Sequence, residues 1–216
     1  MDLLSLGKNP INDDQPTGAE IRYEPEFEEL QAEIDKLSIP SASGELDWQK
    51  VSDLAALILA EKSKNLLVAS YLAVSQVHLN GIDGLALGLN VIHDLLDGYW
   101  ENLFPPKKRM RGRIGAIEWW IEKITAALEG LEVNVMAADK LAEIIGSLTS
   151  IDAFLKENLP DPPLLRPIQR IIESIPTEDE EKAAPQPVPQ PDPPTKAQPQ
   201  PAGPTAQPVA AAAVAT

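Results

Sequence analysis

The sequence contains no cysteine and only two histidines, His78 and His93, so thiolate ligands and nucleophiles are absent and imidazole groups are few. The absence of cysteine excludes disulfides, thiolate metal sites and cysteine nucleophiles. Neither histidine belongs to an HExxH motif or has a second histidine four residues away. We therefore interpret both as structural, and an imidazolium at His78 would complement the dipole of a helix expected to end just after it. The sequence predicts no metal, no cofactor and no catalytic residue.

The motifs of common enzyme classes are also missing. Ser75 lies near His78, but the G-x-S-x-G turn that exposes a hydrolase nucleophile is absent. Gly81, Gly84 and Gly88 follow no predicted strand and precede no Gly-Lys-Ser/Thr ending, so they favour turn and packing roles over phosphate binding. A hydrolase is therefore the least favoured alternative function.

Long apolar runs and an excess of positive charge are lacking too. No stretch approaches the roughly 20 apolar residues that span a bilayer, and residues 1–11 do not resemble a secretory signal. The chain has 33 acidic and 18 basic residues, a net charge of −15, which disfavours nucleic acid and anionic membranes as partners. We expect a cytoplasmic protein without direct membrane insertion, which binds neutral or basic protein surfaces.

The sequence is rich in apolar residues at helical spacing. Phe27, Leu30, Ile34 and Leu37 form one such stripe, and Asp47 is a suitable N-cap for a second helix. Further helices are expected over about 65–79, 84–96, 110–128, 137–157 and 164–175, with a break at Asn80-Gly81 and a stop at Pro105-Pro106. These patterns predict an all-α fold, an antiparallel bundle of about seven helices.

The C-terminal part differs in composition from the rest. Eleven of the 21 prolines lie after residue 175, with no aromatic residue, so this part offers too little apolar surface to offset the entropy of ordering. We expect a disordered Pro/Ala/Gln-rich linker over 176–216. It would follow an N-terminal arm (1–20), a helical core (21–129) and additional helices packed on that core (130–175).

A cluster of basic residues contrasts with the overall negative charge: Lys107, Lys108, Arg109, Arg111 and Arg113. It lies at the start of the expected 110–128 helix, where cations oppose the helix dipole. Three interpretations are open, namely pairing with acids such as the run 24–29, docking of an acidic protein, and nucleic-acid binding. The third lacks interleaved aromatic residues and an overall basic domain.

Adjacent tryptophans at 119 and 120 point about 100° apart on a helix, so both can be buried only if the helix is surrounded. Core packing is the simpler interpretation for all four tryptophans of the chain. The alternative is that one of the pair, Trp119, is an exposed interface anchor, because tryptophan is enriched at binding hot spots.

The run from Gly18 to Phe27, GAEIRYEPEF, combines a glycine turn, a charged and aromatic patch and a helix start. Pro25 suits a first helical turn, where no N–H is needed. Arg22 and Tyr23 are candidates for a binding surface. The alternative is that they fasten the N-terminal arm over the bundle.

This run is followed in order by DW ending at Trp48, SKNL at 63–66, YWENLFP ending at Pro105 and RIGAIEW from Arg113. The succession resembles the N-terminal domain of the TssA/ImpA family of the bacterial type VI secretion system. That family's pattern is approximately G-x-D-x-R-Y-D-P-x-F, D-W, S-K-D-L, Y-W-x-x-x-x-P and R-x-x-A-L-x-W. Glutamates at 20 and 24 replace aspartates, and Asn65 replaces the aspartate of S-K-D-L.

The resemblance spans roughly residues 3–128 and implies structural roles for the residues that carry it. Arg113, the arginine of the last motif, suits an internal structural pair. The motif residues expected to be structural are Gly18, Pro25, Phe27, Trp48, Trp100, Pro105 and Arg113.

The resemblance also implies a function. Members of the family help to assemble the contractile apparatus by contacting baseplate, sheath, inner-tube and membrane-complex subunits. Their C-terminal domains form rings, and their N-terminal domains act as adaptors on linkers. We therefore expect a non-enzymatic adaptor of the secretion system, which joins a ring only if a C-terminal domain is attached. The sequence ends in the expected linker, which fits either a partial chain or a short paralogue. The alternative is a helical interaction protein whose basic cluster binds acidic protein or nucleic acid.

Overall fold

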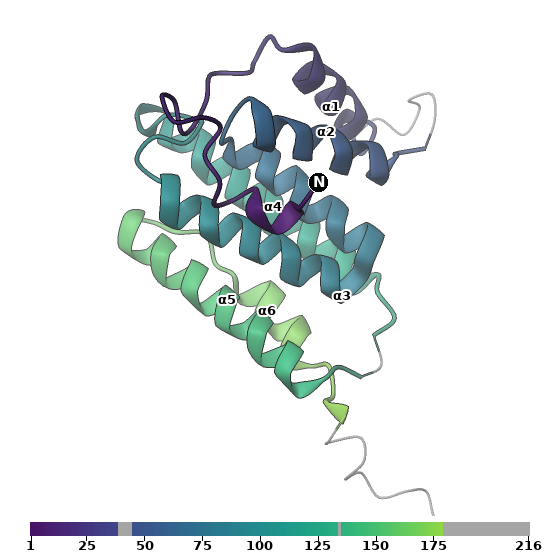
Figure 1. Ribbon diagram of the computed structural model, residues 1–216. Helices are drawn as coiled ribbons and strands as arrows, with labels where there is room; N and C mark the ends of the chain where they lie inside the picture. The colour runs from purple at the N-terminus through teal and green to yellow at the C-terminus, as the bar shows by residue number, and fades with distance from the viewer. Residues whose placement is uncertain (39–44, 134, 179–216) are drawn as a thin grey trace, which may run out of the picture. The chain divides into compact units, whose positions relative to one another are not determined.

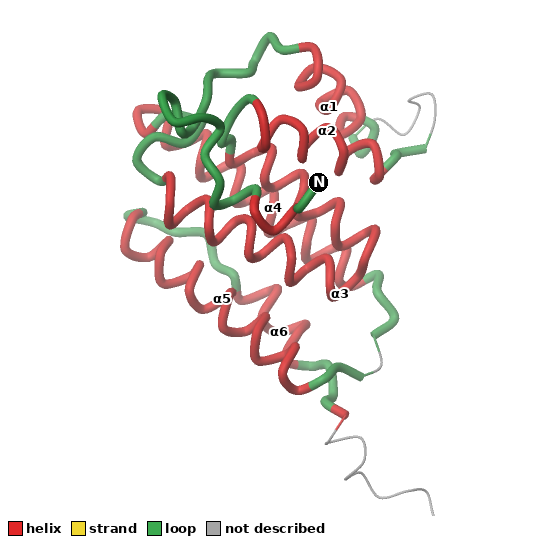
Figure 2. The backbone as a smooth tube through the Cα atoms, viewed as in Figure 1, coloured by secondary structure: helices red, strands yellow, loops and turns green. Residues whose placement is uncertain are grey.

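The computed structural model describes residues 1–38, 45–133 and 135–178, and these residues form a helical bundle (Figure 1). Its helices are α1 (Pro25–Asp35), α2 (Trp48–Glu61), α3 (Leu66–Tyr99), α4 (Met110–Glu129), α5 (Ala138–Asn158) and α6 (Arg166–Glu173), with 3₁₀ turns η1 (Leu3–Ser5) and η2 (Lys107–Arg109). Isolated bridges occur, but no strand is present in the described ranges (Figure 2). The predicted all-α class is confirmed. Residues 179–216, most of the expected linker, lie outside the described residues.

α3 consists of two antiparallel legs that meet at Gly81. This glycine has φ 56° and ψ −128°, a conformation that residues with a side chain rarely adopt. A Cβ atom placed on Gly84 would lie 1.9 Å from the Gln76 carbonyl oxygen, and one on Gly88 would lie 2.8 Å from the Ala73 Cβ. Positions 76 and 84 would be about 12 Å apart on one continuous helix, so the chain reverses here. The predicted break is confirmed, and the two legs give the expected seven helical segments.

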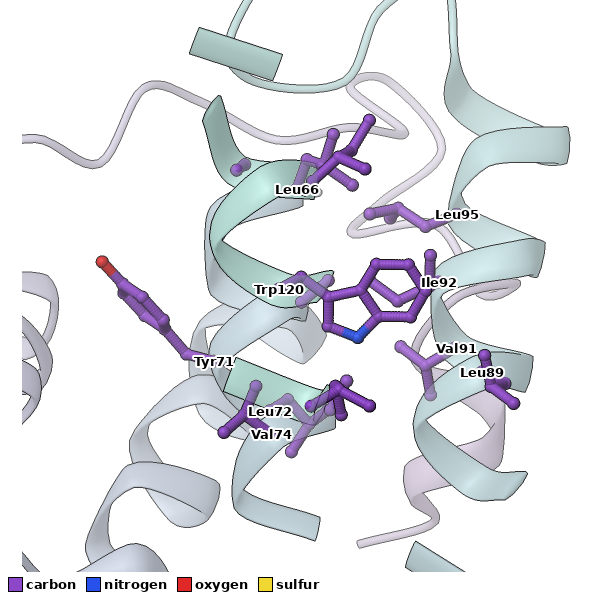
Figure 3. Packing of buried hydrophobic residues seen from close by; sticks show 14 of the residues in the cluster. Leu66, Tyr71, Leu72, Val74, Leu89, Val91, Ile92, Leu95 and Trp120 are labelled. Carbon is purple, nitrogen blue, oxygen red and sulfur yellow. The ribbon is translucent and has the colours of Figure 1, made fainter. Parts of the chain in front are cut away.

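α3 is the central element of the bundle. It contacts α2, α4, α5 and η1, while α1 packs on α2, and α6 packs on α4 and α5. Trp120 of α4 is 1% exposed and lies between the two legs of α3, near Leu72 of one leg and Ile92 of the other (Figure 3). The core is therefore built mainly from the α3 hairpin and α4.

The first helix is shorter than the predicted stripe. α1 ends at Asp35, and the next backbone bonds span three residues, from Lys36 N to Glu33 O and from Leu37 N to Ile34 O. This tighter turn rotates Leu37 away from the apolar stripe, and its side chain is 41% exposed. The expectation that Leu37 is buried is wrong, whereas the predicted N-cap at Asp47 is confirmed by its bond from Lys50 N at 3.0 Å.

None of the helices in the described residues is long and apolar enough to cross a membrane. The first residues of the expected linker continue the folded part, since Met136 N donates to Pro176 O and Glu178 N donates to Met136 O.

Candidate functional site

A surface pocket of about 490 Å³ lies where the segments that carry the family motifs converge. We call it the motif pocket. Its walls come from the segment before α1, from α1, from the start of α3 and from the start of α4. The lining residues are Glu20, Arg22, Phe27, Gln31, Asn65, Leu67, Pro105, Arg109 and Gly112.

The turn at Gly18 positions the segment before α1, whose residues Glu20 and Arg22 form the first wall of the pocket. Gly18 has φ 68°, and a Cβ atom there would lie 2.0 Å from the Lys62 carbonyl oxygen. The flanking backbone is hydrogen-bonded to the segment between α2 and α3, from Ala19 N to Lys62 O at 3.0 Å and from Lys64 N to Thr17 O at 2.8 Å. Only glycine fits this close approach.

The start of α1 is fixed by ion pairs. Lys62 Nζ lies 2.7 Å from Glu24 Oε2 and 2.8 Å from Glu26 Oε2, and its hydrogen bond lowers the pKa of Glu26. Pro25 occupies the first helical turn, and Phe27 is buried beside the pocket. The motif run from 18 to 27 is thus held at both ends.

Asn65 forms the inner wall and begins α3. Its Oδ1 accepts from Leu67 N at 3.0 Å and from Val68 N at 3.4 Å, and the residue is 5% exposed. Because Oδ1 caps the helix, the side-chain NH₂ group is directed away from it. Compared with the aspartate of the S-K-D-L pattern, this asparagine removes one negative charge from the pocket and adds a donor.

Arg113 holds the loop that supplies Pro105. Its guanidinium is fully buried and donates to the carbonyl oxygens of Trp100, Leu103 and Pro105 at 2.6, 2.7 and 2.6 Å. It also lies 4.6 Å from the centroid of the Trp100 ring. Burial lowers the pKa of Arg113. The expected internal contact therefore exists, but its partners are backbone carbonyls rather than an acid.

The basic cluster is partly paired. Lys107 Nζ lies 2.5 Å from Glu101 Oε1, and Arg109 NH1 lies 3.4 Å from Glu20 Oε2. Lys108 and Arg111 are exposed and have no ion pair within the described residues.

The acids at 24–29 are not the partners of the basic cluster, contrary to the first interpretation above. Glu24 and Glu26 pair with Lys62, and Glu29 pairs with Lys50 at 2.7 Å. These acids face α2, because α1 packs on α2 rather than on the start of α4.

Of the predicted interface residues, the structure brings Arg22 and Arg109 together in the motif pocket. Tyr23 is 85% exposed beside them. With Glu20 as the one carboxylate in the lining, the pocket carries a net charge of +1 on a protein of −15. Such a pocket can accept a carboxylate in paired hydrogen bonds from a guanidinium.

The adjacent tryptophans 119 and 120 differ in burial, as expected for neighbouring positions that point in different directions on a helix. Trp120 and Trp100 are buried, at 1% and 5% exposure. Trp119 is half-buried and packs edge-on against Tyr71, with ring centroids 4.8 Å apart. It lies seven residues, about 10 Å, beyond Gly112 along α4, so it can extend a contact surface that begins at the motif pocket.

Trp48 lies outside the motif pocket and is half-buried. It stacks on His78 with ring centroids 4.0 Å apart and an interplanar angle of 8°. Burial lowers the pKa of His78, which works against the imidazolium expected at the helix end.

A buried lysine was missed by the sequence analysis. Lys64 is 1% exposed, and its Nζ donates to Leu6 O at 2.8 Å and Leu59 O at 2.6 Å. Desolvation lowers its pKa to about 8. Its place inside the S-K-N-L motif, two residues before the apolar run Leu66–Val68, was the available signal.

Within the described ranges, no group of three or more His, Asp or Glu side chains could hold a metal ion.

Comparisons with known proteins identify one family from sequence and a similar fold from a solved structure. The family model described as "ImpA, N-terminal, type VI secretion system" matches residues 8–122. The type VI secretion system component TssA1 of Pseudomonas aeruginosa is 33% identical over 103 residues, which cover 44% of this chain and 29% of that protein. The matched part is thus less than a third of that relative's length. The N-terminal domain of a TssA component from Burkholderia cenocepacia has a similar fold, with a TM-score of 0.69 at 18% identity over 81% of this chain and 91% of that one.

Proposed function

Because the chain belongs to the ImpA N-terminal family of the type VI secretion system, we propose that it is a non-enzymatic adaptor in the assembly of that apparatus. Its partners are baseplate, sheath, tube or membrane-complex subunits, and it acts at the cytoplasmic side of the apparatus. It joins a ring only where a C-terminal domain is attached.

The motif pocket supports this function most directly. Arg22 and Arg109, from segments far apart in the sequence, line one cavity together with the donor-bearing Asn65. A bidentate guanidinium contact gives geometric specificity for carboxylates. We therefore propose that this pocket binds an acidic side chain of a partner subunit, and that Tyr23 and Trp119 make apolar contacts beside it.

The adaptor is tested by affinity capture from a lysate of the native host, with the whole chain as bait and mass spectrometry of the captured proteins. The bait should recover secretion-apparatus subunits, and the double variant Arg22→Glu/Arg109→Glu should recover them at least about tenfold less. The matched control is Lys108→Glu/Arg111→Glu, which makes the same charge change at exposed positions outside the pocket.

If both double variants recovered equally fewer apparatus subunits, the motif pocket would not be the binding site, and the loss would be a general effect of charge. Recovery of no apparatus subunit by a folded bait would reject the adaptor function itself. Circular dichroism of each variant establishes that the bait is folded.

A further inference from the structure

A second surface feature lies between α4 and the segment that leads into α6. It is an apolar groove of about 640 Å³ that shares no lining residue with the motif pocket. We call it the α4–α6 groove. Its lining residues are Glu118, Ile121, Glu122, Thr125, Ala126, Glu129, Pro163, Leu164 and Pro167. Most of them lie beyond residue 122, where the family match ends.

One wall of the groove is a single face of α4. Glu118, Glu122 and Glu129 are separated by four and seven residues and therefore lie in a row about 16 Å long. All three are exposed. Lys123 Nζ is 2.8 Å from Glu122 Oε1, whereas Glu118 and Glu129 have no ion pair within the described residues.

The opposite wall is apolar. Leu164 is 67% exposed, although it is a large hydrophobic residue, and Pro163 and Pro167 have fixed φ angles. The neighbouring cations of this segment, Arg166 and Arg170, do not line the groove. The groove thus has an apolar centre and a charged rim, which is the general layout of a protein–protein contact surface.

The charge of the rim decides which occupant fits. The lining carries a charge of −3, and a second copy of this chain has a net charge of −15. The chain's own residues 179–216 carry four acids and two lysines, so they are also net negative. Like charges brought together at an interface are unfavourable, and both of these occupants are disfavoured.

We propose that the α4–α6 groove binds a cationic amphipathic segment of a partner protein, which places an apolar side chain against Leu164 and its Lys or Arg side chains against Glu118, Glu122 and Glu129. The spacing of the glutamates matches cations on one face of a helix of about 11 residues. This site is independent of the motif pocket and carries the opposite charge.

The test uses the whole chain and a fluorescein-labelled peptide of about 14 residues, made of leucine and lysine in amphipathic helical order. Fluorescence anisotropy should show binding that weakens at least about tenfold between roughly 50 and 300 mM NaCl. The double variant Glu118→Lys/Glu122→Lys should weaken binding at least about tenfold, and Leu164→Ser should weaken it severalfold at both salt concentrations.

The matched control is Glu61→Lys/Asp97→Lys, which makes the same charge change at exposed positions of α2 and α3. Equal weakening by both double variants, or no effect of Leu164→Ser, would overturn the proposal. Equal affinity for a leucine–glutamate peptide, or no binding of the lysine peptide, would overturn it as well. Arg22→Glu/Arg109→Glu should leave this binding unchanged, which separates it from the proposed adaptor pocket.

Discussion

At the residue scale, the buried cations of the described part of the chain are Arg113 and Lys64, and both are compensated by backbone carbonyls rather than carboxylates. A carbonyl compensates a buried charge less completely than a carboxylate does, and desolvation is accordingly the leading cause of the lowered pKa of each residue. Each cation joins segments that are otherwise irregular. Arg113 ties together the loop before η2, and Lys64 ties the N-terminal arm at Leu6 to the end of α2.

The arginine cannot be replaced by lysine without loss. Arg113→Lys replaces the planar guanidinium that reaches three carbonyls with a single compact ammonium, which leaves at least one of them unsatisfied. We expect the free energy of unfolding to fall by about 2–4 kcal/mol, measured by urea denaturation. The control Arg111→Lys, on the exposed side of α4, should change it by less than about 0.5 kcal/mol. Similar small effects at both positions would contradict the structural role of Arg113.

Lys64 makes stability depend on pH in alkaline solution. Its pKa is about 8 in the folded protein and near 10.5 in the unfolded chain, so between these values the unfolded state binds more protons. Stability then rises with pH across this window, by up to about 1.4 kcal/mol per pH unit, and the gain is lost as pH falls toward 8. The raised pKa values of Tyr71, at about 12, and Tyr99 act in the opposite direction above about pH 10.

The contribution of Lys64 is isolated by comparison with Lys64→Met. Urea denaturation at pH 7, 8, 9 and 10 should show that the stability difference between the wild type and this variant changes by about 1.4 kcal/mol per unit above pH 8. The difference between the wild type and Lys108→Met, at an exposed lysine, should stay constant over the same range. A constant difference for Lys64→Met would mean that its ammonium is solvated in the folded protein.

At the scale of secondary-structure elements, the α3 hairpin depends on glycines that allow two helices to touch. Gly84→Ala places a Cβ atom 1.9 Å from a backbone oxygen of the facing leg, and the legs must separate. We expect a loss of at least about 2 kcal/mol in the free energy of unfolding. Gly115→Ala makes the same chemical change in α4 with no atom within 4 Å, and it should stabilise the protein by about 0.5–1 kcal/mol. Equal effects at both sites would contradict the close packing of the legs.

The helices could be predicted from sequence because local signals specify them. Asp47 as an N-cap, the break at Gly81 and the apolar spacing in α4 all operate within a few residues. The partners of Lys62 and Arg109 could not be predicted, because they depend on which helices become neighbours. The α4–α6 groove was missed for the same reason, since its two walls are separated by more than 30 residues of sequence. The two arginines of the motif pocket were both predicted as interface residues, but their convergence follows from tertiary packing.

At the scale of the whole molecule, charge is distributed unevenly over a strongly acidic protein. The motif pocket has a net charge of +1, and the α4–α6 groove has a lining charge of −3. Gly112 of the pocket and the glutamates of the groove lie on sides of α4 that differ by roughly 80–120°. One helix therefore contributes to two surfaces of opposite lining charge.

This arrangement predicts that the two surfaces bind independently. Sites without shared contacts have additive energies, so a glutamate-rich labelled peptide and the leucine–lysine peptide should respond to different variants in anisotropy titrations. Arg22→Glu/Arg109→Glu should weaken binding of the acidic peptide at least about tenfold and binding of the basic peptide less than about twofold. Glu118→Lys/Glu122→Lys should have the reverse effect on the two affinities. For each peptide, the change in binding free energy of the quadruple variant should equal the sum of the changes in the two double variants. If either double variant weakened both peptides, the surfaces would be coupled through α4, and the chain would present one extended site instead of two.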